Sequence, residues 1–143
     1  MMKAWMNRQL ISFIYGVIIL IPIELLLNIY RFSRIAKVSI STTIMISSVL
    51  IIISTLFGLL WTYKLTAIWV KTKRQAFLPV LLWFPYFLSL MYLIATLFPM
   101  TYEGDRPNPV SGLIMIASII IYPIVVFGFQ MLGMHKKSSE ELL

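Results

Sequence analysis

The residues of greatest chemical interest are a carboxylate, an amide and a guanidinium at helical spacing in the first apolar run. Glu24 is followed by Asn28 four residues later and by Arg31 three residues after that, so a helix would place all three on one face. A charge inside a membrane span costs at least about 2.5 kcal/mol, so Glu24 is expected to face other helices or water. Pro22 frees a backbone carbonyl one turn back and adds an acceptor nearby.

Two interpretations of Glu24 follow from this position. As a functional group, it would be the proton or cation site of a small oligomeric transporter or channel. As a structural group, it would be a buried polar tie, hydrogen-bonded to another span or paired with Arg31 from the interface. We favour the structural interpretation.

The rest of the chain lacks a complete catalytic constellation. It has no cysteine, which excludes disulfides, thiol nucleophiles, Cys-ligated zinc and iron–sulfur clusters. The single histidine, His135, lies beside two lysines beyond the last apolar run. Glu103 and Asp105, in the proline-rich segment 99–109, are expected to be solvated rather than to hold a metal. We therefore expect a protein that is not an enzyme and has no cofactor and no metal site.

The elements that position these groups are expected to be membrane-spanning helices. Of the 143 residues, 60% are hydrophobic and only 12% are charged, whereas soluble domains are about 45–50% apolar and about 25% charged. A spanning helix needs about 20 mainly apolar residues. Four stretches qualify, at 10–29, 40–60, 77–97 and 110–132. The predicted fold is all-α, one domain built as a bundle of four transmembrane helices.

The first apolar stretch resembles a secretory signal peptide only superficially. It is too long, it is interrupted by Pro22 and Glu24, and no small-residue cleavage site follows it. We expect it to be retained as the first helix.

The distribution of positive charge predicts the orientation. Eight of the twelve lysine and arginine residues fall on the side that holds both termini, and four fall on the other side. This excess predicts that both termini are cytoplasmic, in a plasma membrane that the short loops and missing cysteine suggest is bacterial. The exception is the first outer loop, where Arg31, Arg34 and Lys37 lie together. The net charge of +7 is expected to serve anionic lipid headgroups, not nucleic acid.

Two further groups of residues suggest contact surfaces. Ser47, Ser54 and Gly58 form a stripe of small residues that would let another helix approach closely. The segment 61–75 is amphipathic, and either lies in the inner headgroup layer or continues the second helix out of the membrane. Its expected lipid contacts are Trp61, Lys64, Trp69, Lys71, Lys73 and Arg74.

The leading functional expectation is a membrane protein that acts without catalysis by binding a partner. It would be an accessory subunit of a membrane complex or a protective, immunity-type protein, with a second membrane protein or another copy of itself as its partner. The first alternative is the transporter or channel that uses Glu24, which prolines within three of the spans support slightly. The second alternative, handling of lipids or lipid-linked sugars, depends on the aromatic third span and the basic inner rim.

Overall fold

The computed structural model describes residues 2–69 and 73–140, and it places the side chains of residues 3, 5–69 and 77–134. This part of the chain is all-helical, and four of its helices are long and apolar enough to cross a membrane. The predicted four-helix transmembrane fold is therefore confirmed. The elements are α1 (Met2–Leu27), α2 (Ile29–Ala36), α3 (Ile40–Trp69), α4 (Lys73–Leu97), the 3₁₀ turn η1 (Glu103–Asp105) and α5 (Pro109–Glu140).

Local side-chain chemistry explains where two of the long helices begin. The hydroxyl oxygen of Ser39 accepts a hydrogen bond from the Thr42 amide at 3.1 Å and thus caps the start of α3. The side-chain oxygen of Asn108 accepts a bond from the Ser111 amide at 2.9 Å and caps α5. Pro109 follows at the first helical position, where a missing amide hydrogen costs nothing.

The structure shifts the helix boundaries expected from hydropathy. The first span runs Trp5–Leu27 instead of 10–29, because Asn28 leaves the helical conformation with φ −104° and ψ 15° and the short α2 begins after it. The chain then turns at Lys37, which has a left-handed φ of 55°. The second span is longer than the predicted 40–60, because α3 continues without a break to Trp69. Of the two possibilities for segment 61–75, its described part up to Trp69 therefore continues the helix.

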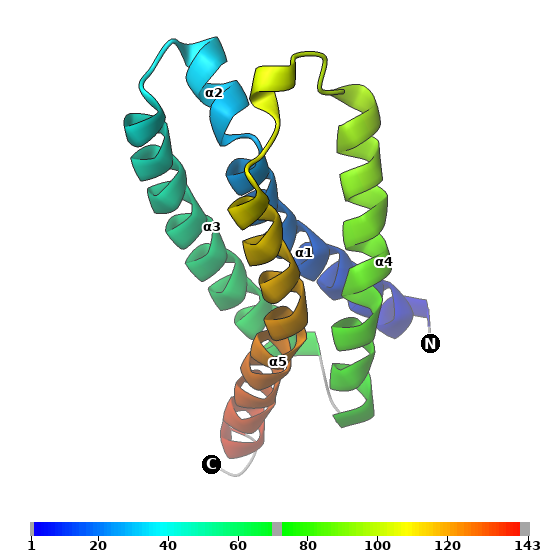
Figure 1. The fold of residues 1–143 in the computed structure, drawn as a ribbon. Helices are drawn as coiled ribbons and strands as arrows, with labels where there is room; N and C mark the ends of the chain where they lie inside the picture. The colour runs from blue at the N-terminus through cyan, green and yellow to red at the C-terminus, as the bar shows by residue number, and fades with distance from the viewer. Residues whose placement is uncertain (1, 70–72, 141–143) are drawn as a thin grey trace.

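Helix α1 lies at the centre of the bundle. It packs against α3 on one side and α4 on the other, while α5 contacts α1, α3 and α4 (Figure 1). About 44% of its most apolar window is buried inside the protein, against 17–22% for the other three spans. Helix α2 and η1 lie together at one end of the bundle, and α1 starts and α5 finishes toward the other end. Four crossings therefore place both termini on the same side.

The core forms where α1, α4 and α5 meet. Tyr15 and Ile11 of α1 are fully buried beside Phe87 of α4 and Val126 of α5. The rings of Trp83 and Tyr122 meet edge-to-face at 4.9 Å between centroids, an arrangement that favours aromatic pairs. Because no water competes within a bilayer, close packing of this kind is a main source of helix association there.

Glycine residues mark the closest approaches between helices. A Cβ atom on Gly16 would lie 3.1 Å from the amide nitrogen of Phe87, so α1 and α4 touch backbone to backbone. One on Gly133 would lie 3.1 Å from the carbonyl oxygen of Tyr63, which brings α5 equally close to α3. One on Gly58 would collide with Ile18 of α1. Small residues allow such contacts between membrane helices.

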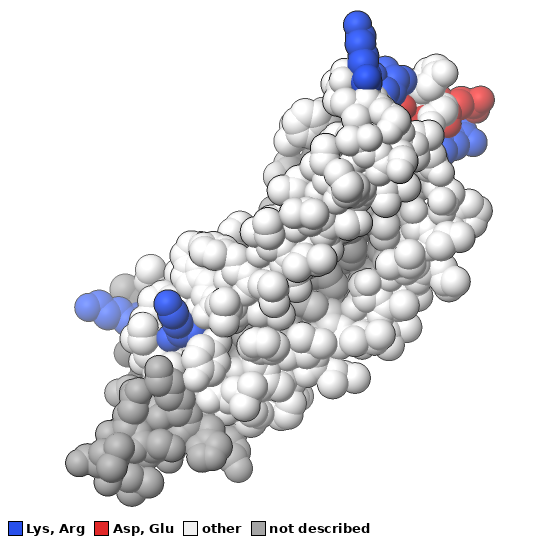
Figure 2. All heavy atoms as spheres, turned by 90° about the vertical axis from the view of Figure 1, so that its left-hand side faces the viewer, with Lys and Arg blue, Asp and Glu red and all other residues white. Residues whose placement is uncertain are grey.

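The surface has the charge distribution of a membrane-embedded protein. On the face shown in Figure 2, lysine, arginine, aspartate and glutamate side chains gather at the two ends, and the surface between them carries none. Many large apolar side chains of the spanning helices are exposed, including Phe57 of α3 at 64% and Ile124 of α5 at 72%. Lipid is the solvent that such a surface suits.

Candidate functional site

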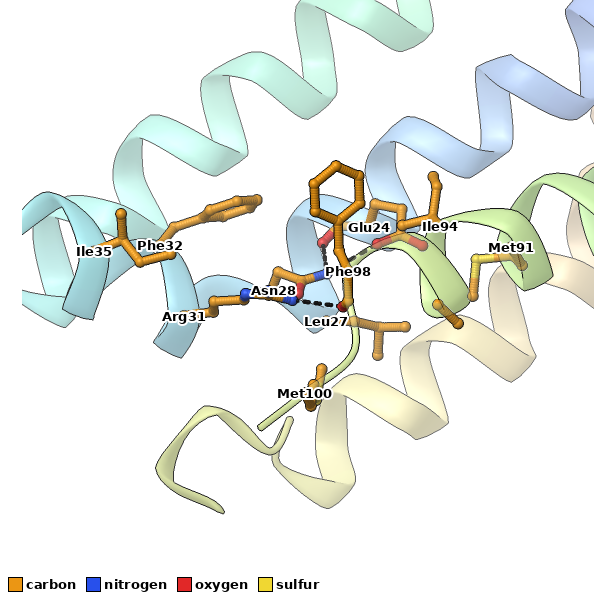
Figure 3. A pocket seen from close by; sticks show the side chains of 11 residues that line it. Glu24, Leu27, Asn28, Arg31, Phe32, Ile35, Met91, Ile94, Phe98 and Met100 are labelled. Atoms are coloured by element: carbon orange, nitrogen blue, oxygen red, sulfur yellow. Dashed lines mark hydrogen bonds between the residues drawn. The ribbon is translucent and has the colours of Figure 1, made fainter. Parts of the chain in front are cut away.

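A groove lies beside the predicted polar group. It lies between the α1–α2 junction and the end of α4, with a volume of about 610 Å³. The structure thus places Glu24, Asn28 and Arg31 in one groove, although a break at Asn28 divides them between α1 and α2. The other lining residues are apolar: Leu27, Phe32, Ile35, Met91, Ile94, Ala95, Phe98 and Met100 (Figure 3).

Glu24 is partly buried and is hydrogen-bonded by Asn28, the residue directly after α1. The Asn28 side-chain nitrogen donates to Glu24 Oε2 at 2.9 Å and to the Glu24 backbone oxygen at 3.0 Å. Among the described residues, the side-chain hydrogen bond to Glu24 thus comes from Asn28 and not from another span. Arg31 acts on the carboxylate electrostatically but forms no direct ion pair with it. The break after Leu27 explains this, because Asn28 is free to fold back on the preceding turn while Arg31 is carried toward α4.

Arg31 binds the C-terminal end of α4. Its Nη1 donates to the backbone oxygen of Phe98 at 2.9 Å, directly after α4 finishes at Leu97. The last carbonyl groups of a helix lack partners within it, and they carry the negative end of the helix dipole. Arg31 therefore joins α2 to the C-terminal end of α4 at the end of the bundle that holds η1.

The outer connector is bound to α2 by a second arginine. Arg34 donates from Nε to Asp105 Oδ1 at 2.9 Å and from Nη2 to Asp105 Oδ2 at 2.7 Å. Hydrogen bonding from Arg34 is the main cause that lowers the pKa of Asp105, against a smaller opposing effect of burial. The neighbouring Glu103 pairs instead with Arg106 at 3.3 Å. The expectation of a solvated carboxylate is therefore wrong for Asp105, which is 2% exposed in its ion pair, whereas Glu103 is solvated as expected, with 88% of its side chain exposed.

A second polar cluster lies on the side of the bundle that holds the termini, and sequence reasoning missed it. The hydroxyl of Tyr15 faces the side chains of Gln130, Thr62 and Thr66, which come from α5 and α3 and are fully buried. Among the described residues, Tyr15 Oη, Thr66 Oγ1 and both amide atoms of Gln130 lack a hydrogen bond of normal geometry. In the sequence, only Gln130 could have indicated this cluster, because it is an isolated amide within the fourth apolar run.

An apolar layer separates this cluster from the groove. Along α1, Ile18, Ile19, Leu20 and Ile23 lie between Tyr15 and Glu24 and are at most 6% exposed. Nine residues of helix correspond to about 13 Å. In this conformation the two polar regions are therefore distinct sites, one toward each side of the membrane.

The small-residue stripe of α3 is divided among different environments. Ser47 is buried at 4% exposure, and Gly58 packs directly on Ile18. Ser54 is only half-buried, and its hydroxyl donates to the Ile51 backbone oxygen at 3.1 Å within α3.

The predicted inner lipid contacts are placed only in part. Trp61 is 50% exposed and Lys64 is exposed, whereas Trp69 is partly buried against the core. Lys71 lies outside the described residues, as do the side chains of Lys73 and Arg74.

The aromatic side chains of α4 are divided between the core and the surface, where Phe77 is 50% and Phe84 41% exposed. Trp83 and Phe87 are at most 3% exposed, and the Tyr86 hydroxyl donates to Gln9 Oε1 at 2.6 Å. Tyr92, by contrast, is 74% exposed. The buried rings are therefore not a free surface on which a flat ligand could stack.

No known protein family, no curated protein and no solved structure matches this chain.

Proposed function

We propose that this chain is a non-catalytic membrane protein that acts by binding a partner in the groove between the α1–α2 junction and α4. It serves as an accessory subunit or as a protective, immunity-type protein. The observation that supports this most is the groove itself. Its volume of about 610 Å³ lies within the range of ligand-binding sites, about 300–1,000 Å³, and it combines apolar walls with a few polar groups.

The chemistry of the groove supports binding rather than catalysis. Its lining offers one carboxylate, one amide and one guanidinium, and Asn28 and Phe98 engage these groups in hydrogen bonds. General acid–base or nucleophilic catalysis needs a reactive group and a partner within hydrogen-bond reach. The described lining contains neither a hydroxyl nor a thiol nucleophile.

Site-specific photocrosslinking in native membranes tests the proposal. A photoreactive amino acid at Ala95, in the groove, is compared with one at Ile124, which is 72% exposed on α5. Defined adducts from the Ala95 position, but not from Ile124, are expected. Equal, diffuse crosslinking from both positions would mean that the groove faces only bulk lipid and would count against the proposal.

A transporter remains the second candidate because α1 carries two polar sites at different depths. Glu24 lies in the groove and Tyr15 lies in the buried cluster with Gln130, so α1 offers polar groups on both sides of the apolar layer that a transported ion would have to cross. Ion or proton flux in proteoliposomes that Glu24→Gln abolishes would support this candidate. Flux at the level of empty liposomes for the unmodified protein would remove it.

We further propose a plasma-membrane location with both termini cytoplasmic. The excess of lysine and arginine on the side of the termini supports this orientation. Because the chain has no cysteine, single substitutions Lys3→Cys and Ser39→Cys can report it. A membrane-impermeant maleimide should label Ser39→Cys in intact cells, and Lys3→Cys only after permeabilisation. The opposite pattern would invert the orientation.

A further inference from the structure

We propose that the groove binds an amphiphilic cation, with the ligand's ammonium group against the Glu24 carboxylate and its apolar portion against Met91, Ile94 and Phe98. This inference rests on the proposed function, which requires only that the groove holds a ligand. The further inference concerns the sign of the ligand's charge. We infer that sign from the partners that each charged side chain near the groove already has.

The two arginines of α2 nearest the groove, Arg31 and Arg34, already have dipolar or anionic partners. Arg31 donates to the Phe98 backbone oxygen at the C-terminus of α4, where the helix dipole is negative. Arg34 forms two hydrogen bonds to Asp105 and lies 5.0 Å from the centre of the Tyr102 ring. An anionic ligand would have to compete with these partners before it could use either guanidinium.

The negative group in the groove is under-compensated. Glu24 receives its side-chain hydrogen bond from Asn28, a neutral amide, on Oε2. Of the described residues, none donates a hydrogen bond to Glu24 Oε1 and none forms a direct ion pair with the carboxylate. Arg31, in the same groove, acts on the carboxylate only through longer-range electrostatic attraction, because its guanidinium is turned to the Phe98 backbone oxygen. A charged group held partly away from water is costly unless it is paired. An ammonium group would supply the missing partner.

The walls of the groove suit the apolar portion of such a ligand. Leu27 and Phe32 form one side, and Met91, Ile94 and Phe98 form the other. Methionine adapts its shape to irregular ligands. Glu24 lies inside the span Trp5–Leu27, so an amphiphile dissolved in the bilayer can reach the carboxylate laterally. A neutral apolar molecule would fill the same volume but would leave Glu24 unpaired and further desolvated.

The test compares two photoreactive probes of equal chain length, an alkyl-trimethylammonium and an alkyl-sulfonate, on the full chain in nanodiscs of zwitterionic lipid. Labelled residues are mapped by mass spectrometry. The cation is expected to label the groove residues about ten times more than the sulfonate, which is about 1.4 kcal/mol of selectivity. Glu24→Gln should lose this preference, and Glu24→Asp should retain part of it.

Glu103→Gln is the matched control, because it removes the same charge from a side chain that is 88% exposed on the outer connector. It should leave the labelling unchanged. Circular dichroism and gel filtration establish that each variant is folded. If the sulfonate labels the groove as well as the cation does, or if folded Glu24→Gln keeps the preference, the ligand class is wrong while groove binding stands. If neither probe labels the groove above the level at Ile124, amphiphile binding fails, and the crosslinking from Ala95 then decides separately whether the groove binds a protein partner.

Discussion

Arg34 and Asp105, which are 71 residues apart in the chain, form a two-pronged ion pair that joins α2 to η1. Asp105 is 2% exposed, and its partner is one of the three positive residues that made the outer loop an exception to the usual charge distribution. Arg34 and Arg31 both have partners that hold α2, η1 and the C-terminal end of α4 together. These structural contacts give the two arginines a role that does not depend on which side of the membrane they face.

The ion pair predicts a specific dependence of stability on pH. Arg34 lowers the pKa of Asp105 below its usual value, which is about 3.9 in an unfolded chain. The carboxylate therefore contributes stability above about pH 4, and this contribution is lost as the pH falls through the lower pKa of the folded state. Melting temperature measured from pH 7 to pH 2 should fall more for the unmodified protein than for Asp105→Asn. Glu103→Gln, at an exposed carboxylate, should follow the unmodified protein, and identical profiles for all three would contradict the assignment.

The contact of Gly16 with α4 predicts a strong effect of a single methyl group. Gly16→Ala should lower the free energy of unfolding by about 1–3 kcal/mol, the usual range for overpacking, because the Phe87 amide and Trp83 carbonyl are backbone atoms that cannot move aside. The control is Gly128→Ala on α5, where no atom lies within 4 Å of the added carbon. That change should stabilise the helix by about 0.5–1 kcal/mol. SDS titration measures both, and equal effects would mean that α1 and α4 are not in backbone contact.

The amide of Gln130, which faces the Tyr15 hydroxyl but lacks a hydrogen bond of normal geometry, predicts a gain in stability when it is removed. Gln130→Met keeps the shape and should raise the free energy of unfolding by about 1–3 kcal/mol, the cost of an unsatisfied buried polar group. Gln9→Met is the matched control, since it deletes the acceptor of the 2.6 Å bond from Tyr86 and should destabilise the protein. A loss of stability in Gln130→Met as large as that in Gln9→Met would show that the amide is hydrogen-bonded.

The hydroxyl of Tyr122 joins α5 to α1 by a hydrogen bond that we expect to contribute modestly to stability. It donates to the Tyr15 backbone oxygen at 2.7 Å in a buried setting. Tyr122→Phe should lower the free energy of unfolding by about 0.6 kcal/mol, the average for a hydrogen bond between membrane helices. Tyr92→Phe removes an equivalent hydroxyl from a side chain that is 74% exposed and should have no effect. A larger loss in Tyr92→Phe than in Tyr122→Phe would refute the link.

The sequence by itself determined the class of fold. Runs of apolar residues long enough to cross a bilayer must be helical, because the hydrocarbon core supplies no water to satisfy open backbone groups. The grouping of Glu24, Asn28 and Arg31 also followed from helical spacing, since neighbouring turns stay close even across the break at Asn28. Both results depend only on local geometry and on the solvent.

The tertiary structure alone decided which groups are partners. Asp105 meets Arg34, Arg31 meets Phe98, and Tyr15 meets Gln130 across separations that no periodicity reveals. The centre of the bundle was equally hidden, because every span is apolar all round and hydropathy does not distinguish a face toward lipid from a face toward protein. The close approaches at Gly16 and Gly133 identify faces of α1 and α5 that contact protein. Where these approaches occur depends on where each helix crosses its neighbour.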